Sequence, residues 1–207
     1  LPHEDKQQAE LAKIMGLTLA KVQSRVRELH ESNPMLGHRG CRLTVTYPEI
    51  LEMQVRAIVE AAIDCLRSNI KAFPEIMIPL VGTKKELEYL RTLTEQTIAK
   101  VKEEEDYKPR LDIKIGTMIE IPRAAVTANE IAQHADFFSF GTNDLTQLTF
   151  GYSRDDVGTF LPDYIHRELL PGDPFQSLDT GGVGQLIDMG VTKGRSVKPD
   201  LKVGICG

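Results

Sequence analysis

The chain has 207 residues, of which 25 are basic, 30 are acidic and 41% are hydrophobic. Such a composition is typical of a globular protein with a core and excludes intrinsic disorder. The net charge of −5, with no basic stretch interleaved with aromatic residues, argues against nucleic acid as a partner. No apolar run is long enough to span a membrane, and the first residues lack the pattern of a signal peptide. Three widely spaced cysteines, Cys41, Cys65 and Cys206, argue against a disulfide framework or a zinc site. They favour a reducing compartment, such as the cytoplasm or an organelle.

Before residue 74, helices are expected over residues 4–32 and from Pro48 onward, with a short segment, 35–43, between them. Apolar residues recur at helical spacing within residues 4–32, where Thr18 is a candidate N-cap. Asn33-Pro34 then stops the helix, and Pro48 suits the first turn of a second, long helix.

Strands alternate with helices in the remainder of the chain. Apolar runs predict strands, and capping boxes at Thr83/Glu86 and Thr127/Glu130 predict the starts of helices. The expected strands are 75–81, 113–121, 137–140 and 202–207, and a short helix is expected over 183–189. Residues 151–182 have no sustained period and predict a long loop with short helical pieces, a kind of segment that is usually functional.

This alternation predicts an α/β fold with a parallel sheet covered by helices. No GxGxxG motif follows any strand, so a dinucleotide-binding fold has no support. A (β/α)₈ TIM-type barrel fits better, but the chain supplies only about five of the eight strands. Either the sheet is open, or residues 1–207 are part of a barrel.

The stretch Phe137–Gln147 is the first candidate for chemistry. An apolar strand ends at Gly141, and small polar residues follow at once: Thr142, Asn143 and Asp144. Such an arrangement presents ligand groups at the carboxyl edge of a sheet. The alternative is that Asp144 only caps the helix that follows.

Glu120 is the second candidate. With the alternation of a strand, Ile115, Thr117, Ile119 and Ile121 share one face, and Gly116, Met118 and Glu120 share the other. If the isoleucine face packs against helices, Glu120 points into a barrel at the carboxyl end of its strand. A buried carboxylate needs a partner, either a nearby arginine such as Arg123 or a cation. Together with Asp144 it would suit Mg²⁺.

Two further segments contain reactive groups. Arg39 and Arg42 lie among glycines, where an anion can approach the backbone and a guanidinium can grip a phosphate or carboxylate. Cys206 lies at the end of the last strand, in the segment between Gly204 and Gly207. Its thiol could exchange protons, or it could be a small core residue.

In this order, these motifs resemble the carboxyl-terminal domain of the pyruvate, phosphate dikinases, in the PEP-utilising enzyme family. The matching stretches are 33–43, 116–125, 137–147, 153–156 and 203–207. PEP synthases and the enzyme I of sugar phosphotransferase systems share the Gly-Thr-Asn-Asp-Leu core. The Gly-His-Arg-Gly-Cys-Arg-Leu segment is more similar to the dikinases.

The resemblance implies a (β/α)₈ barrel that binds pyruvate or PEP with Mg²⁺. By motif, Glu120 and Asp144 would bind the metal, and Arg39 would hold the phosphoryl or carboxylate group. The pocket would be lined by Gly141, Thr142 and Asn143, and Cys206 would exchange a proton with the substrate carbon. The family enzyme converts ATP, phosphate and pyruvate to AMP, pyrophosphate and PEP through a phosphohistidine on a separate domain.

The resemblance covers strands three to seven of such a barrel. Residues 1–207 are therefore expected to be a partial PEP/pyruvate-binding domain of a larger enzyme, inactive alone and forming a homodimer. The phosphohistidine and nucleotide-binding domains of that enzyme would be its partners. A non-catalytic binding or dimerisation module is an alternative from another class. A Mg²⁺-dependent aldolase of the citrate lyase type is a third, but it gives no role to Arg39 or Cys206.

Overall fold

The computed structural model describes residue 2 and residues 4–207. The chain forms two compact units, which divide between His38 and Arg39. No helix among the described residues has the length and apolar character needed to cross a bilayer.

The first unit is a helical hairpin. It contains α1 (Asp5–Met15), α2 (Leu19–Glu28) and a 3₁₀ turn, η1 (Pro34–Leu36). The helical pattern over residues 4–32 is interrupted at Gly16, which adopts a left-handed φ of 63° and ends α1. Thr18 caps α2 as expected, since its side chain accepts a hydrogen bond from the Lys21 N–H at 3.3 Å.

The second unit is an α/β domain with a parallel sheet. Its strands are β1 (Glu75–Ile78), β2 (Lys114–Ile119), β3 (Phe137–Gly141) and β4 (Lys202–Cys206), in the order β1-β2-β3-β4. Four strands therefore form the sheet within the described residues, so the expectation of about five was wrong. The prediction of a parallel α/β arrangement is confirmed.

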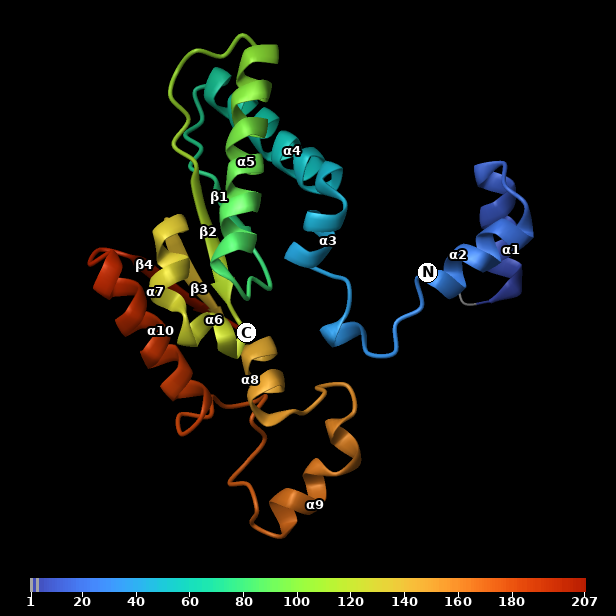
Figure 1. Ribbon diagram of the computed structural model, residues 1–207, viewed down its shortest axis with the longest axis vertical. Helices are drawn as coiled ribbons and strands as arrows, with labels where there is room; N and C mark the ends of the chain where they lie inside the picture. Colours follow the sequence, from blue (N-terminus) through green and yellow to red (C-terminus); the bar gives the residue numbers. More distant parts are fainter. Residues whose placement is uncertain (1, 3) are drawn as a thin grey trace. The chain divides into compact units, whose positions relative to one another are not determined.

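Helices follow the strands along the chain, and Figure 1 shows α4 and α5 beside β1 and β2, with α6, α7 and α10 beside β3 and β4. The helices are α3 (Cys41–Thr46), α4 (Pro48–Arg67), α5 (Lys84–Glu104), α6 (Pro122–Val126), α7 (Ala128–Ile131), η2 (Ala132–His134), α8 (Thr142–Phe150), η3 (Val157–Thr159), α9 (Leu161–His166) and α10 (Val183–Val197).

The sequence patterns that predict helix starts are correct where the side chain caps the helix. They are wrong where the side chain has another hydrogen-bond partner. Pro48 begins α4, and Thr83 and Glu86 form the expected capping box of α5. The box at Thr127 was wrong, because this hydroxyl donates to the Arg123 carbonyl at 2.9 Å and caps nothing. The helix expected over 183–189 continues to Val197.

The two faces of the sheet differ as the alternation in β2 predicts. Ile115, Thr117 and Ile119 are at most 3% exposed and lie on the face covered by helices, together with Phe138 and Phe140. The opposite face of the sheet carries Glu75 at the start of β1 and Lys202 at the start of β4.

On this second face the outer strands β1 and β4 are linked by a side-chain ion pair. The Lys202 ammonium contacts the Glu75 carboxylate at 2.7 Å, and this hydrogen bond lowers the pKa of Glu75. Because two long side chains can together span the roughly 14 Å between the outer strands of a flat four-stranded sheet, closure into a barrel stays a prediction.

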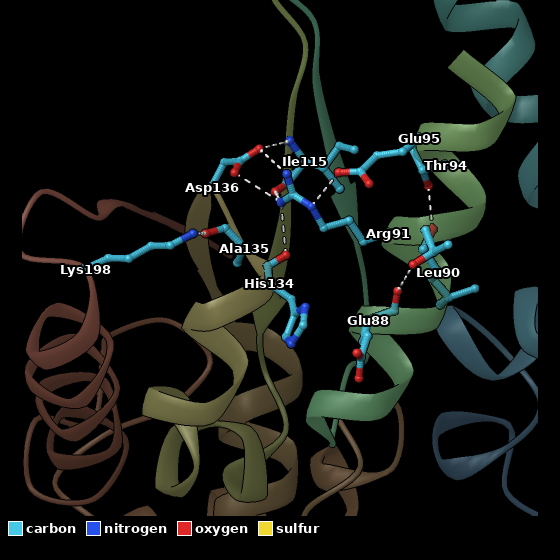
Figure 2. Close-up of polar contacts among 11 residues, drawn as sticks. Glu88, Leu90, Arg91, Thr94, Glu95, Ile115, His134, Ala135, Asp136 and Lys198 are labelled. Atoms are coloured by element: carbon cyan, nitrogen blue, oxygen red, sulfur yellow. Dashed lines mark hydrogen bonds and ion pairs between the residues drawn. The ribbon is translucent and has the colours of Figure 1, made fainter. Parts of the chain in front are cut away.

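The amino-terminal edge of β2 and β3 is fastened by Arg91 of α5 (Figure 2). Its guanidinium donates to the Asp136 carboxylate at 3.1 and 3.3 Å and to the Ile115 and His134 carbonyls at 3.2 and 3.1 Å. Asp136 in turn accepts from the Ile115 N–H at 2.8 Å. This cluster joins α5 to the first residues of β2 and β3. It lies at the amino-terminal end of the sheet, the end that in barrel proteins contributes to stability and not to catalysis.

Candidate functional site

The carboxyl edge of the sheet brings the predicted residues together. Glu120 follows β2, β3 ends at Gly141, and Cys206 ends β4 directly opposite Gly141 in the strand register. Parallel strands all deliver their carboxyl ends to one edge, so three separate motifs converge there.

Glu120 is a buried carboxylate, only 3% exposed. Burial raises its pKa to about 7; the neighbouring Asp144 carboxylate also raises it, whereas the Leu80 N–H and Arg39 oppose the rise. The backbone N–H of Leu80 donates to Glu120 Oε1 at 2.7 Å. The expected alternative, an ion pair with Arg123, was wrong, because the Arg123 guanidinium donates to the Gly82 carbonyl instead.

Leu80 is a site residue that the sequence pattern did not reveal. Its φ of 59° is unusual for a residue other than glycine, and this conformation turns its N–H toward Glu120. Pro79 precedes it and ends β1 earlier than the expected Val81. The Leu80 carbonyl accepts a hydrogen bond from the buried Cys41 thiol at 3.2 Å. Strained backbone of this kind concentrates at functional sites.

Asp144 lies in the first turn of α8 and faces both Glu120 and Arg39. Arg39 Nη2 donates to Asp144 Oδ2 at 2.7 Å, and the Asp144 carboxylate is near enough to Glu120 to raise the pKa of Glu120. The capping interpretation was wrong, since the N-cap position is Gly141 and no side chain caps the helix. Asp144 instead joins the ends of two neighbouring strands to the Arg39 segment.

Gly141 makes this convergence possible. A Cβ atom at this position would lie 2.6 Å from Glu120 Oε2 and 2.6 Å from Met118 Cε. Any larger residue would therefore displace the carboxylate. The space beside the two acidic side chains exists because β3 ends in glycine.

The acidic pair fits a divalent cation. Two carboxylates held in contact repel each other, and a cation between them relieves that repulsion. Mg²⁺ is usually bound through one or two carboxylates, with water and substrate oxygens completing its shell. No group of three or more acidic, histidine or cysteine side chains that could hold a metal occurs among the described residues, so a magnesium site stays a prediction.

Cys206 is an exposed free thiol, so the alternative of a core residue was wrong. Its Sγ lies 3.6 Å from the Ser139 hydroxyl. The Thr142 hydroxyl donates to the Cys206 carbonyl at 3.1 Å. The thiol is thus held at the sheet edge with access to solvent, whereas Cys41 is fully buried and burial raises the pKa of Cys41 to about 12.

A cavity of about 300 Å³ adjoins Cys206 and the start of α8. Its walls are Thr142, Asn143 and Cys206 on one side and residues 174–178 of the long loop on the other. Arg154 also lines it, and its guanidinium donates to Asn143 Oδ1 at 2.9 Å. Arg154 lies in one of the matching sequence stretches, but only the structure brings it to the cavity.

A sequence model described as "PEP-utilising enzyme, PEP-binding domain" matches residues 5–207. The chain belongs to the PEP-utilising enzyme family. This membership agrees with the resemblance that the motifs indicated.

Three similar relatives are each named as a pyruvate, phosphate dikinase. The chain is 58% identical to pyruvate, phosphate dikinase of Clostridium symbiosum over 100% of its own length and 24% of the relative's. It is 55% identical to the chloroplastic pyruvate, phosphate dikinase of Mesembryanthemum crystallinum over 100% of its length and 22% of the relative's. With the chloroplastic dikinase 1 of Arabidopsis thaliana it shares 56% identity over 96% of the chain and 20% of the relative. The chain thus spans a quarter or less of these relatives.

Most predicted residues of the PEP-binding domain meet in the second unit. Arg39 and Asp144 form an ion pair beside Glu120, and Gly141 leaves space for the Glu120 carboxylate. Thr142, Asn143 and Cys206 line the adjacent cavity. The two carboxylates are not among the residues that line this cavity, so the acidic cluster and the cavity are neighbouring parts of the same edge.

Proposed function

We propose that the chain is the pyruvate- and PEP-binding part of a pyruvate, phosphate dikinase. The whole enzyme would transfer a phosphoryl group between a phosphohistidine on another domain and the enolate of pyruvate, and would overall convert ATP, phosphate and pyruvate to AMP, pyrophosphate and PEP. One observation carries the proposal: Arg39, Glu120 and Asp144 meet at the carboxyl edge of adjacent strands. The names of the relatives favour a dikinase over a PEP synthase or an enzyme I.

The acidic cluster would hold Mg²⁺ through Glu120 and Asp144. When bound, the ion would stabilise the negative charge that develops on the enolate oxygen. Leu80 supports this role by directing its N–H at one oxygen of Glu120, which fixes the orientation of the carboxylate. Gly141 supports it by leaving the second oxygen uncovered by a Cβ atom.

Cationic and polar groups next to the cluster would bind the anionic parts of the substrate. Arg39 contacts Asp144 and offers a guanidinium fork suited to phosphoryl or carboxylate oxygens. Arg154 brings a second guanidinium to the cavity, beside Thr142 and Asn143. These groups orient the substrate and neutralise its charge before transfer.

Cys206 would handle the proton at carbon. In the direction of PEP synthesis, its thiolate takes a proton from the methyl group of pyruvate, the C–H electron pair forms the carbon–carbon double bond of the enolate, and the π pair of the carbonyl moves onto its oxygen. That oxygen attacks the phosphorus of the phosphohistidine, the P–N bond breaks, and the imidazole keeps the electron pair. The exposure of the thiol and its position at the end of β4, next to β3, support this role.

We also propose that residues 1–207 are part of a (β/α)₈ barrel that forms a homodimer in the cytoplasm or an organelle. The parallel order of strands alternating with helices supports the barrel, and within the described residues β1 and β4 each have only one neighbouring strand. An unpaired strand edge has free N–H and C=O groups that can pair with a further strand. The phosphohistidine and nucleotide-binding domains would be supplied by other parts of the enzyme, so the 207-residue chain is expected not to form PEP.

Isothermal titration calorimetry with oxalate, which mimics the enolate, tests this function. The protein is expected to bind oxalate only with Mg²⁺ present, and Glu120→Gln should weaken binding by roughly tenfold or more, as expected when a charged ligand group is lost. Glu95→Gln, at the opposite end of the sheet, is the matched control and should leave binding unchanged. Absence of Mg²⁺-dependent binding by the unaltered protein would contradict the proposal.

A further inference from the structure

Gln147 is a buried polar residue in α8, only 7% exposed, to which neither the sequence motifs nor the proposed reaction gives a role. Both polar atoms of its carboxamide form hydrogen bonds. Nε2 donates to Asp144 Oδ1 at 3.4 Å, one turn earlier in the helix. Oε1 accepts a hydrogen bond from the Arg154 backbone N–H at 2.8 Å.

The chain around Gln147 is folded back so that Arg154 returns to the start of α8. Gly151 ends the helix in a left-handed conformation with φ 70°, and its N–H donates to the Gln147 carbonyl. The Tyr152 N–H donates to the same carbonyl at 3.0 Å. Backbone and side chain of Gln147 therefore both hold the segment 151–154, and the Arg154 guanidinium reaches Asn143 Oδ1 from there.

We propose that Gln147 is a positioning residue that fixes the Arg154 segment relative to Asp144. It joins the acidic part of the site to the cationic part that lines the cavity. Only a carboxamide of this length meets both requirements, because a donor must face the carboxylate while an acceptor faces the backbone N–H. Glutamate keeps the acceptor and loses the donor, whereas methionine loses both at similar length.

The first test measures the link itself and needs no ligand. Amide hydrogen exchange by NMR should show the Arg154 N–H protected in the unaltered protein and exchanging at least tenfold faster in Gln147→Met. The Tyr152 N–H, which bonds to the backbone carbonyl of residue 147, is the internal control and should keep its protection. Gln147→Glu should keep the Arg154 N–H protected, so it serves as the second variant if Gln147→Met does not fold. Unchanged Arg154 exchange in Gln147→Met, or its loss in Gln147→Glu, would overturn the proposal.

The second test asks whether Gln147 acts through Arg154, and this part rests on the proposed function. Gln147→Met should weaken Mg²⁺-dependent oxalate binding roughly tenfold, the size of one lost hydrogen bond to a charged group. In an Arg154→Met background the same change should have little further effect, because residues that act as a unit are not additive. Full additivity would refute the positioning role. If the unaltered protein does not bind oxalate, the proposed function fails while the exchange experiment still decides the role of Gln147.

Discussion

Replacing Glu120 with glutamine is expected to stabilise the metal-free protein while weakening its Mg²⁺-dependent binding. Glutamine has the same shape and can still accept the hydrogen bond from Leu80. It cannot carry the negative charge that repels Asp144, and its amide can donate to that carboxylate. The substitution therefore removes the unfavourable part of the cluster and keeps the favourable part.

The magnitude follows from the pKa of Glu120, which burial and Asp144 raise from 4.5 to about 7. Below pH 4.5 the carboxyl is protonated in both the folded and the unfolded state. As the pH rises toward 7, the unfolded state releases its proton first, so the free energy of unfolding falls. Above pH 7 the loss is complete and amounts to about 3 kcal/mol, which Glu120→Gln should recover.

Urea denaturation in EDTA at about pH 5 and about pH 8 checks this prediction. The variant should exceed the unaltered protein by about 3 kcal/mol at the higher pH and by much less at the lower pH. Glu95→Gln, an exposed carboxylate, should show no such difference. If Glu120→Gln lowers stability at both pH values, the carboxylate is a net stabilising group and the reasoning is refuted.

Further predictions concern both edges of the sheet. Arg91→Met should lower the free energy of unfolding by about 2–4 kcal/mol in urea denaturation, because several partly buried acceptors lose a charged donor. Glu95→Gln should cost about 0.5 kcal/mol or less, as loss of a surface ion pair does. A loss below 1 kcal/mol for Arg91→Met would show that the cluster in Figure 2 is not a structural fastening. After reaction with iodoacetamide near neutral pH, mass spectrometry should find Cys206 modified and Cys41 unmodified. Cys41 is fully buried, and its pKa is raised to about 12. Rapid labelling of Cys41 in the folded protein would contradict its burial. Arg39→Lys should weaken Mg²⁺-dependent oxalate binding in calorimetry about tenfold, because an ammonium cannot form a bidentate fork; unchanged affinity would exclude this role.

The sequence was sufficient for the features that depend on local patterns. Alternation in residues 113–121 assigned Glu120 to the face opposite the isoleucines, and burial of Ile115 and Ile119 agrees with it. The capping box at Thr83 and the proline at position 48 predicted helix starts correctly. These signals succeed because the partners are only a few residues apart along the chain.

Contacts between residues that are far apart along the chain could not be predicted from local sequence patterns. The pairing of Arg39 with Asp144 joins residues 105 positions apart, and the sequence could nominate both without showing that they touch. The Leu80 N–H donates to Glu120 because the backbone of Leu80 is left-handed. Nothing in the sequence predicts this conformation, since leucine rarely adopts it. Thr127 has the same capping-box pattern as Thr83, but its hydroxyl donates to the Arg123 carbonyl and does not cap a helix.

The sequence by itself therefore determined the family, the parallel α/β class and the residues able to carry chemistry, because these follow from motifs and from short-range periodicity. Only the tertiary structure decided the ion pair between Lys202 and Glu75, the pairing of Arg39 with Asp144 and the link from Gln147 to Arg154. The physical reason is that strand pairing and packing set which distant groups meet, and those energies belong to the folded chain as a whole.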